Sequence, residues 1–253
     1  KMNNIQTFIM IFQYRLRPLA ILGCIVCLGC EQKFYKKGYD VEIAGSTITD
    51  ETGLPVSPSE WTVEFSEDFS RIEVGSEPES LFILDGAYTV QTDQDQGEIL
   101  ALPGSPVGDF GLLFGPRIKD KALELRFSFF STNKGRRKPS IAAGIGGIRG
   151  LRLRLNPAAK NLVLSSEEKI LKTLPFLWTA GQWWSVRFQM VPEDSFQSTV
   201  VKYKLWPKLE EEPSSWLVSE KFSLEYKGGK CALWGFPYAS TPILFDDLSI
   251  HYK

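Results

Sequence analysis

Short stretches in which apolar and polar residues alternate recur along the chain from residue 61 onward. In ALELRFSFF (122–130) leucine and phenylalanine alternate with charged or hydroxyl residues. WSVRFQMV (184–191) and LRLRLNP (151–157) repeat this pattern. A period of two places successive side chains on opposite faces of a β-strand. These stretches are therefore predicted to be strands with one buried face.

About a dozen such stretches follow one another at spacings of roughly 8–15 residues, separated by Gly, Pro, Asn and Asp, and this rhythm is typical of sandwiches and barrels. No stretch longer than ten residues carries a helical period. The pattern predicts an all-β protein, built as a two-sheet antiparallel jelly-roll sandwich.

Two glycine-containing segments suggest turns. Asp85-Gly86 stands between two apolar stretches and predicts a hairpin turn. AAGIGGIRG (142–150) superficially matches a dinucleotide-binding fingerprint, but Arg149 occupies the third glycine position and another strand, not a helix, follows. A tight turn or bulge between strands is therefore predicted at 142–150.

The composition is that of a globular protein with a substantial core. The chain has 253 residues, of which 43% are hydrophobic and 13% aromatic, and its formal net charge is -1. This balance offers no clustered basic excess of the kind that nucleic-acid binding requires. The sequence contains one histidine, His251, so any histidine-based metal site or catalytic triad depends on that residue.

The N-terminal segment has the layout of a secretory signal. Arg15 and Arg17 precede an apolar run at 19–28, and polar residues follow Cys30. The run is too short to cross a bilayer as a helix, which takes about 20 apolar residues. Export is therefore expected, with an uncleaved signal anchor as the alternative.

Leu28-Gly29-Cys30 resembles the lipobox of bacterial lipoproteins. The resemblance implies that Cys30 becomes the lipidated first residue of a mature protein held at the membrane of the bacterial cell envelope. Cys24, which ends a second lipobox-like stretch, is the alternative lipidation site. The domain organisation expected on this basis is a signal peptide (1–29), a lipid-anchored tether (30–60) and one jelly-roll domain (61–253).

Five motifs in a fixed order resemble the concanavalin A-like jelly-roll superfamily, in particular its LamG-like and 3-keto-disaccharide-hydrolase-like (DUF1080-type) domains. They are FSEDFS (65–70), LFILDGAYTVQ (81–91), AGQWWSVRFQM (180–190), KYKLWPKLEEEPSSW (202–216) and STPILFDDLSIHY (240–252). The resemblance implies two curved antiparallel sheets, frequent sugar binding, occasional glycoside cleavage and a structural calcium ion.

Asp246 is the most informative acidic residue. If ILFDDLSIHY is a regular strand, Asp246 shares the inward face with Leu248 and Ile250. A carboxylate on that face must be paired, hydrogen-bonded or metal-bound. One interpretation is a calcium site formed by Asp246 with Asp68 and Glu67. The other is a carboxylate that accepts backbone N–H groups from a neighbouring turn.

Catalytic groups are harder to find. Glycosidases of this fold carry paired carboxylates in an E-x-D-x-E pattern, which the sequence lacks. The LEEEP segment (209–213) is predicted to be an exposed loop with solvated charges, and His251 a surface residue. The sequence therefore favours a non-catalytic protein, with a glycoside hydrolase as the alternative.

Carbohydrate binding is the function that the exposed strand faces favour, with basic side chains for polar contacts and tryptophans for stacking. The candidate residues are Arg126, Arg152, Arg154, Arg187, Trp183 and Trp206. Two other interpretations remain: surface arginines also prevent strand-edge pairing, and sandwich tryptophans often pack in the core. A structural or assembly subunit that binds another envelope protein is the remaining function class.

Overall fold

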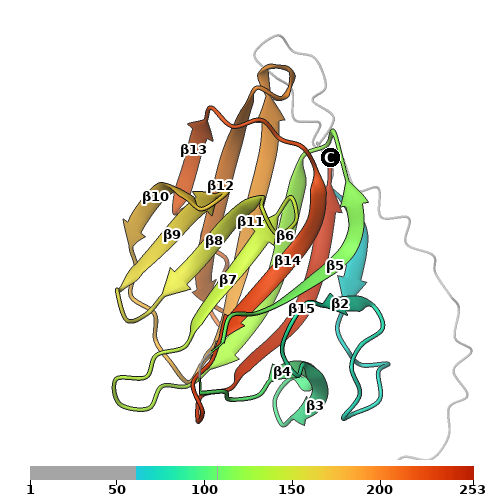
Figure 1. The fold of residues 1–253 in the computed structure, drawn as a ribbon, viewed down its shortest axis with the longest axis vertical. Helices are drawn as coiled ribbons and strands as arrows, with labels where there is room; N and C mark the ends of the chain where they lie inside the picture. Colours follow the sequence, from blue (N-terminus) through green and yellow to red (C-terminus); the bar gives the residue numbers. More distant parts are fainter. Residues whose placement is uncertain (1–60, 107) are drawn as a thin grey trace, which may run out of the picture. The chain divides into compact units, whose positions relative to one another are not determined.

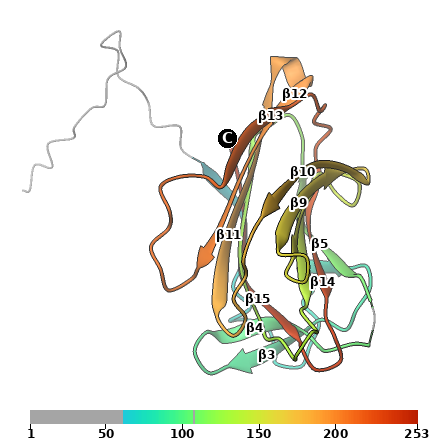
Figure 2. The same ribbon diagram turned by 90° about the vertical axis from the view of Figure 1, so that its left-hand side faces the viewer.

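The computed structural model describes residues 61–106 and 108–253. These residues form two antiparallel β-sheets packed face to face (Figures 1 and 2). The predicted all-β jelly-roll sandwich is confirmed. The predicted signal peptide, tether and lipidation sites lie outside the described residues.

Within the described residues, one sheet has eight strands. Its strand β15 pairs with three others, namely β1, β4 and β6. Its strands, in spatial order, are β13 (Val218–Phe222), β12 (Ser198–Pro207), β11 (Trp183–Glu193), β6 (Leu123–Ser131), β15 (Ile243–Tyr252), β4 (Gly97–Leu102) and β3 (Thr89–Asp93), with β1 (Thr62–Glu67) beside β15.

The other sheet has seven strands in the same part of the chain and lies in front in Figure 1. In spatial order they are β10 (Lys169–Pro175), β9 (Asn161–Ser166), β8 (Leu151–Asn156), β7 (Ser140–Ile145), β14 (Gly229–Phe236), β5 (Phe110–Ile118) and β2 (Leu81–Ile83). A single helical turn, η1 (Asp194–Phe196), joins β11 to β12.

The core lies between the sheets and follows the alternation in the sequence. The inward residues of β6 and β11 are all buried, namely Leu123, Leu125, Phe127, Phe129, Trp184, Val186, Phe188 and Met190. Burying each large apolar side chain is worth about 1.5–3 kcal/mol relative to exposure. Cys231 of β14 is also buried, as its apolar surroundings in the sequence predict, and burial raises the pKa of its thiol to about 12.

The two glycine segments have different outcomes. The predicted turn at 142–150 is confirmed, since Gly146 and Gly147 have φ values of 98° and 81° between β7 and β8. The hairpin predicted at Asp85-Gly86 is wrong, because β2 belongs to the seven-stranded sheet and β3 to the eight-stranded sheet. This turn carries the chain from one layer to the other.

In the part of the chain that the structure describes, no helix is long and apolar enough to cross a membrane.

Candidate functional site

The outer face of the eight-stranded sheet carries its polar and aromatic side chains in cross-strand rows. Directly opposite residues on neighbouring antiparallel strands share a face and lie side by side. From one end to the other, the rows on β6, β11 and β12 are Phe130–Trp183, Ser128–Ser185–Trp206, Arg126–Arg187–Lys204 and Glu124–Gln189–Lys202. The face therefore changes from aromatic to cationic over the four residues from Trp183 to Arg187, which is about 13 Å of strand.

The structure brings together four of the six predicted sugar-binding residues. Arg126, Arg187, Trp183 and Trp206 lie on this outer face. Arg152 and Arg154 lie on β8, in the seven-stranded sheet, on the other side of the sandwich. The six residues therefore cannot line a single groove.

A fully buried carboxylate organises the cationic rows. Glu124 accepts hydrogen bonds from the guanidinium groups of Arg126 and Arg187 and from the side-chain amide of Gln189. The Nε atom of Arg187 lies 2.6 Å from Oε2 of Glu124. These partners compensate for the cost of removing the Glu124 charge from water.

The connection from β12 to β13, residues 208–217, covers part of this face, and we refer to it as the covering loop. Figure 2 shows it on the side of the eight-stranded sheet that faces away from the other sheet. Oε1 of Glu212 lies 2.7 Å from both Nη1 of Arg187 and Nζ of Lys204. Lys204 also donates to the carbonyl oxygen of Pro213 at 2.5 Å, and the Trp216 ring centre lies 4.8 Å from its Nζ.

Charge and burial compete in this cluster. Burial acts to raise the pKa of Glu212, but hydrogen bonds and charge from Lys204 and Arg187 outweigh it and lower the pKa. Glu212 therefore stays ionised at neutral pH. Separately, the pKa of His251 is lowered by burial and by the charge of Arg126.

A pocket of about 550 Å³ lies at the aromatic end of the face, and we refer to it as the Trp183 pocket. Phe130 and Trp183 form an aromatic wall with their ring centres 5.7 Å apart. The end of β3 contributes Asp93, and the turn that follows it contributes Asp95 and Gln96. The pocket is completed by Gly181, Gln182, Pro207, Lys208 and Leu209.

Lys208 links this pocket to β15. Its Nζ lies 5.4 Å from the centre of the Trp183 ring and 2.7 Å from Oδ2 of Asp247, and it donates to Oε1 of Gln96. The pocket thus combines an apolar ring face with carboxylate and amide oxygens and one cation. Pockets of this size with an aromatic wall and a few polar groups are typical of small-molecule sites.

Asp246 lies on this outer face and not on the inward face that regular alternation predicts. A bulge shifts the register of β15 after Asp246, and Asp247 has a φ of 53°. As a result Phe245, Leu248 and Ile250 all reach the core. Bulges insert one unpaired residue and so reverse the side-chain alternation beyond them.

Asp246 is nevertheless 4% exposed. Its carboxylate accepts the backbone N–H of Asp247 and lies 3.6 Å from Nζ of Lys208. Burial, and then the charge of Asp247, raise the pKa of Asp246 to about 6. The hydrogen-bonded interpretation of Asp246 therefore matches its contacts.

The three predicted calcium ligands have separate partners. Glu67 accepts the backbone N–H of Phe69 and the hydroxyl of Ser80, while Asp68 accepts both the N–H and the hydroxyl of Ser70. No group of three His, Cys, Asp or Glu residues within 61–106 and 108–253 is arranged to hold a metal ion. The contacts of Asp246, Asp68 and Glu67 give the calcium prediction no support.

The outer face of the seven-stranded sheet has a different character. Arg152 stacks on Trp234 with 4.0 Å between the guanidinium carbon and the ring centre, and Arg154 stacks on Phe236 at 3.8 Å. Arg152 also pairs with Asp109. Trp234 is 5% exposed, so these two arginines cover the aromatic rings rather than frame an open stacking surface.

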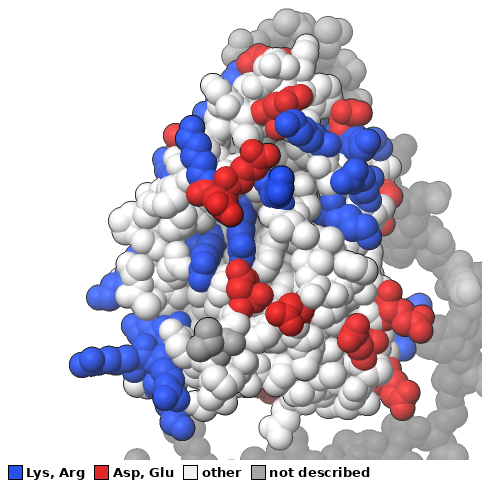
Figure 3. Space-filling model, in the orientation of Figure 1, with Lys and Arg blue, Asp and Glu red and all other residues white. Residues whose placement is uncertain are grey.

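Figure 3 shows this second face, where cations and carboxylates are intermixed except for a group of cations at the lower left. That position corresponds to the connection between β6 and β7 in Figure 1. Its basic residues are Lys134, Arg136, Arg137 and Lys138, of which the first three are exposed.

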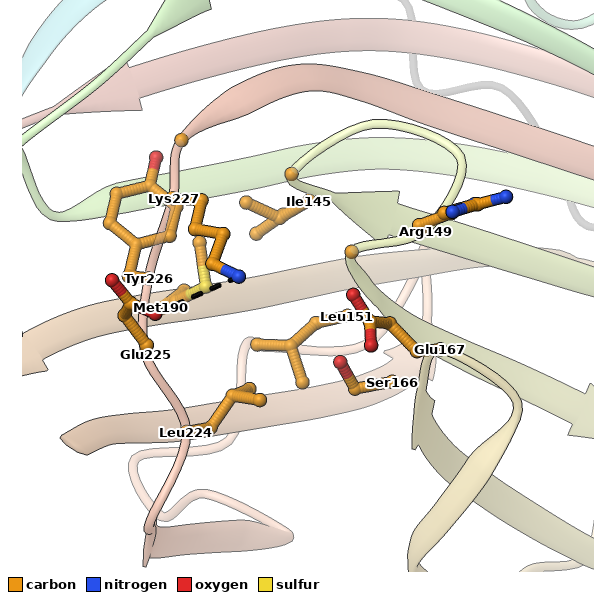
Figure 4. Close-up of a pocket in the computed structure, with 13 residues that line it drawn as sticks. Ile145, Arg149, Leu151, Ser166, Glu167, Met190, Leu224, Glu225, Tyr226 and Lys227 are labelled. Atoms are coloured by element: carbon orange, nitrogen blue, oxygen red, sulfur yellow. Dashed lines mark ion pairs between the residues drawn. The ribbon is translucent and has the colours of Figure 1, made fainter. Parts of the chain in front are cut away.

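A second pocket, of about 220 Å³, lies between the turn that precedes β8 and the segment that precedes β14 (Figure 4). Its apolar lining comprises Ile145, Leu151, Met190, Leu224 and Tyr226, and its charged lining comprises Arg149, Glu167, Glu225 and Lys227. None of the residues that the sequence suggested for sugar or metal binding lines it.

Sequence reasoning missed the residues that connect the face to its loop. Glu212 was expected to be solvated with its neighbours, and its contacts with Arg187 and Lys204 show otherwise. Glu210 and Glu211 are exposed as expected. The outward position of Lys204 in its strand indicated a further cation on the face. No local sequence pattern indicated that the loop folds back across the sheet.

Comparison with known proteins supports the fold. No protein-family model matches the chain, and neither does any curated protein. Among solved structures, the metal-free carbohydrate recognition domain of Emp46p is similar, with a TM-score of 0.52 and 10% identity over 76% of this chain and 97% of that domain. Its potassium-bound form gives 0.53 and 12% over 76% and 98%. Lectin II from Ulex europaeus overlaps less well, at 0.49 and 14% over 76% and 99%.

The likeness to the Emp46p domain places the chain in the concanavalin A-like jelly-roll fold. At such a low identity it concerns the fold alone, so a function for this chain has to be argued from its own residues.

Proposed function

We propose that this chain is a non-catalytic carbohydrate-binding protein and that sugar binds in the Trp183 pocket. The observation that carries the proposal is the wall of Trp183 and Phe130 beside the oxygens of Asp93, Asp95 and Gln96. A sugar ring has an apolar C–H face and a rim of hydroxyl groups. The indole suits the first, and carboxylate and amide oxygens accept hydrogen bonds from the second.

The fold is consistent with this proposal, because Emp46p, whose domain is described as a carbohydrate recognition domain, shares it. We do not include calcium in the proposal. The residues expected to bind calcium already have other partners, and the similar Emp46p structures include a metal-free form and a potassium-bound form.

Glycan-array binding of the full chain, followed by calorimetry with the best neutral glycan, tests the proposal. Trp183→Ala is expected to weaken binding at least tenfold, because truncating an aromatic anchor in a pocket typically costs about 2 kcal/mol or more. Trp61→Ala is the matched control, since Trp61 is half-buried and does not line the Trp183 pocket. Unchanged affinity in a folded Trp183→Ala protein, or no glycan bound at all, would contradict the proposal.

We further propose that the protein acts at the bacterial cell envelope as a lipoprotein anchored through Cys30. The support is the order of Arg15 and Arg17, the apolar run at 19–28 and the lipobox-like ending. Metabolic labelling with a fatty-acid analogue tests it. Label lost in Cys30→Ala and retained in Cys24→Ala is the expected result, and the reverse pattern would move the anchor to Cys24.

A further inference from the structure

We propose that Arg187 and Lys204 form a carboxylate-binding subsite for acidic sugars, which Glu212 of the covering loop occupies when no ligand is bound. This inference rests on the proposed function and narrows the ligand to glycans that contain a uronic acid or another carboxylated sugar. The Trp183 pocket then binds another sugar of the same glycan.

The two cations are arranged to bind one carboxylate together. Nη1 of Arg187 and Nζ of Lys204 converge on the same oxygen of Glu212, each at 2.7 Å. Hydrogen bonds between charged partners at this distance are about twice as strong as neutral ones. The face therefore already binds one carboxylate group, and the carboxylate of a sugar acid presents the same two oxygens.

Lys204 is unusually buried for a lysine. Its side chain is 5% exposed, and its ammonium group contacts Glu212, the Pro213 carbonyl and the Trp216 ring of the covering loop, while the centre of the Trp206 ring of β12 lies 5.9 Å away. A buried ammonium needs a compensating partner. Any ligand that lifts the loop away from Lys204 is therefore favoured if it brings a carboxylate of its own.

The local charge balance also favours an anionic ligand. Glu124 is fully buried and already forms ion pairs with Arg126 and Arg187. Arg126, Arg187 and Lys204 carry three positive charges against the two carboxylates of Glu124 and Glu212. Without Glu212 the cluster has two uncompensated positive charges. An open loop without a ligand is therefore disfavoured, and exchange of Glu212 for an anionic ligand is favoured.

The covering loop is held to the sheet by few contacts. Residues 210–215 are exposed. Within the described residues, the backbone N–H groups that hold the loop belong to Lys208, Glu210 and Leu217, near its two ends. The middle of the loop depends on Glu212, Pro213 and Trp216, so a competing carboxylate acts where the loop is attached. Loops with few backbone hydrogen bonds belong to the least stable parts of a fold.

The spacing suits an oligosaccharide. Arg187 lies four residues along β11 from Trp183, or about 13 Å. Trp206, opposite Ser185, stands between them on the same face. An extended glycan of a few sugars can therefore stack on Trp183 and place a carboxylate against Arg187 and Lys204.

The test compares trigalacturonate with its fully methyl-esterified form, which removes the charges and keeps the ring sequence. We expect the full chain to bind the acid at least tenfold more tightly than the ester, because a charged hydrogen bond contributes about 1.5–3 kcal/mol and 1.4 kcal/mol is tenfold. The affinity for the acid is also expected to fall as salt is added, while the affinity for the ester stays constant.

Three variants separate the subsite from general effects on the loop. Glu212→Gln removes the internal carboxylate and is expected to strengthen binding of the acid about threefold to tenfold while leaving the ester unchanged. Lys204→Met is expected to remove the preference for the acid, and Lys204→Arg to restore part of it. Glu211→Gln, an exposed neighbour in the same loop, is the control and should change neither affinity.

Each remaining outcome would overturn the inference. Equal affinity for the acid and the ester would remove the subsite while leaving carbohydrate binding intact. Equal gains for both ligands in Glu212→Gln would show that the loop blocks access without mimicking a ligand. Equally tight binding of a glutamate-rich hexapeptide would show that the site recognises acidic chains in general and not sugars.

Discussion

The ammonium group of Lys204 lies 2.7 Å from the Glu212 carboxylate, although the two residues are eight positions apart and Glu212 lies in a largely exposed loop. This ion pair fastens the middle of the covering loop to the sheet. Lys204 is buried but the Glu212 side chain is 38% exposed, so the pair is only partly shielded from the solvent that weakens most surface ion pairs. The behaviour of the loop should therefore depend on this one lysine.

Lys204→Met is expected to lower the free energy of unfolding by about 1–2 kcal/mol and to speed amide exchange across residues 210–217. Methionine keeps most of the apolar stem but leaves the Pro213 carbonyl without its donor. Urea unfolding and hydrogen exchange measure the two effects. Lys202→Met, on the same face and strand, is the control and should leave loop exchange unchanged.

Glu124→Ala is expected to destabilise the protein by about 1–3 kcal/mol, because Arg187 and the Gln189 amide lose a buried acceptor, while Arg126, with 39% of its side chain exposed, retains contact with water. Glu211→Ala, which truncates an exposed glutamate of the covering loop, should change stability by no more than about 0.5 kcal/mol. Chemical denaturation of both variants is the measurement. A loss below about 1 kcal/mol in Glu124→Ala would mean that solvent reaches the arginines readily.

Much of the fold was predictable because strands with one buried face repeat every second residue. This period placed Phe127, Phe188 and their neighbours in the core and Arg126 and Arg187 outside, as observed. The pattern says nothing about which sheet a strand joins. Arg152 and Arg187 were therefore grouped in one face, although β8 and β11 belong to different sheets.

The site was predictable only in part, for two physical reasons. The bulge at Asp246 depends on one residue with a left-handed backbone conformation, Asp247, and nothing in the apolar pattern reports it. The contact of Glu212 with Arg187 joins residues 25 positions apart through a loop without periodicity. Local sequence patterns indicate strands and turns, but not where a loop comes to rest.

Removing calcium with EDTA is expected to leave the melting temperature unchanged. Asp246, Asp68 and Glu67 are already hydrogen-bonded within the protein, through Asp247, Ser70, and Phe69 with Ser80, respectively. A specific ion would stabilise the folded state by mass action, so its removal would lower the melting temperature. Thermal unfolding in about 1 mM calcium, a concentration that fills even weak sites, is compared with unfolding in EDTA and distinguishes the two cases. A lower melting temperature on chelation would contradict this expectation and show that the protein binds calcium.

Asp246→Asn is expected to change how stability depends on pH. Burial raises the pKa of Asp246 from 3.8 to about 6, so between these values the folded protein binds more protons at this site than the unfolded chain does. The contribution of Asp246 to the free energy of unfolding is therefore fully present below about pH 4, falls as the pH rises and is lost above about pH 6.

The neutral asparagine keeps an oxygen for the Asp247 N–H but has no charge to bury. The free energy of unfolding of the variant relative to the native protein should consequently increase by about 1–3 kcal/mol from pH 4 to pH 7. Urea unfolding at several pH values measures it, and Asp120→Asn, an exposed aspartate, provides the control. A relative stability that decreases over this range would mean that the attraction of Lys208, 3.6 Å away, outweighs the cost of burying the Asp246 charge.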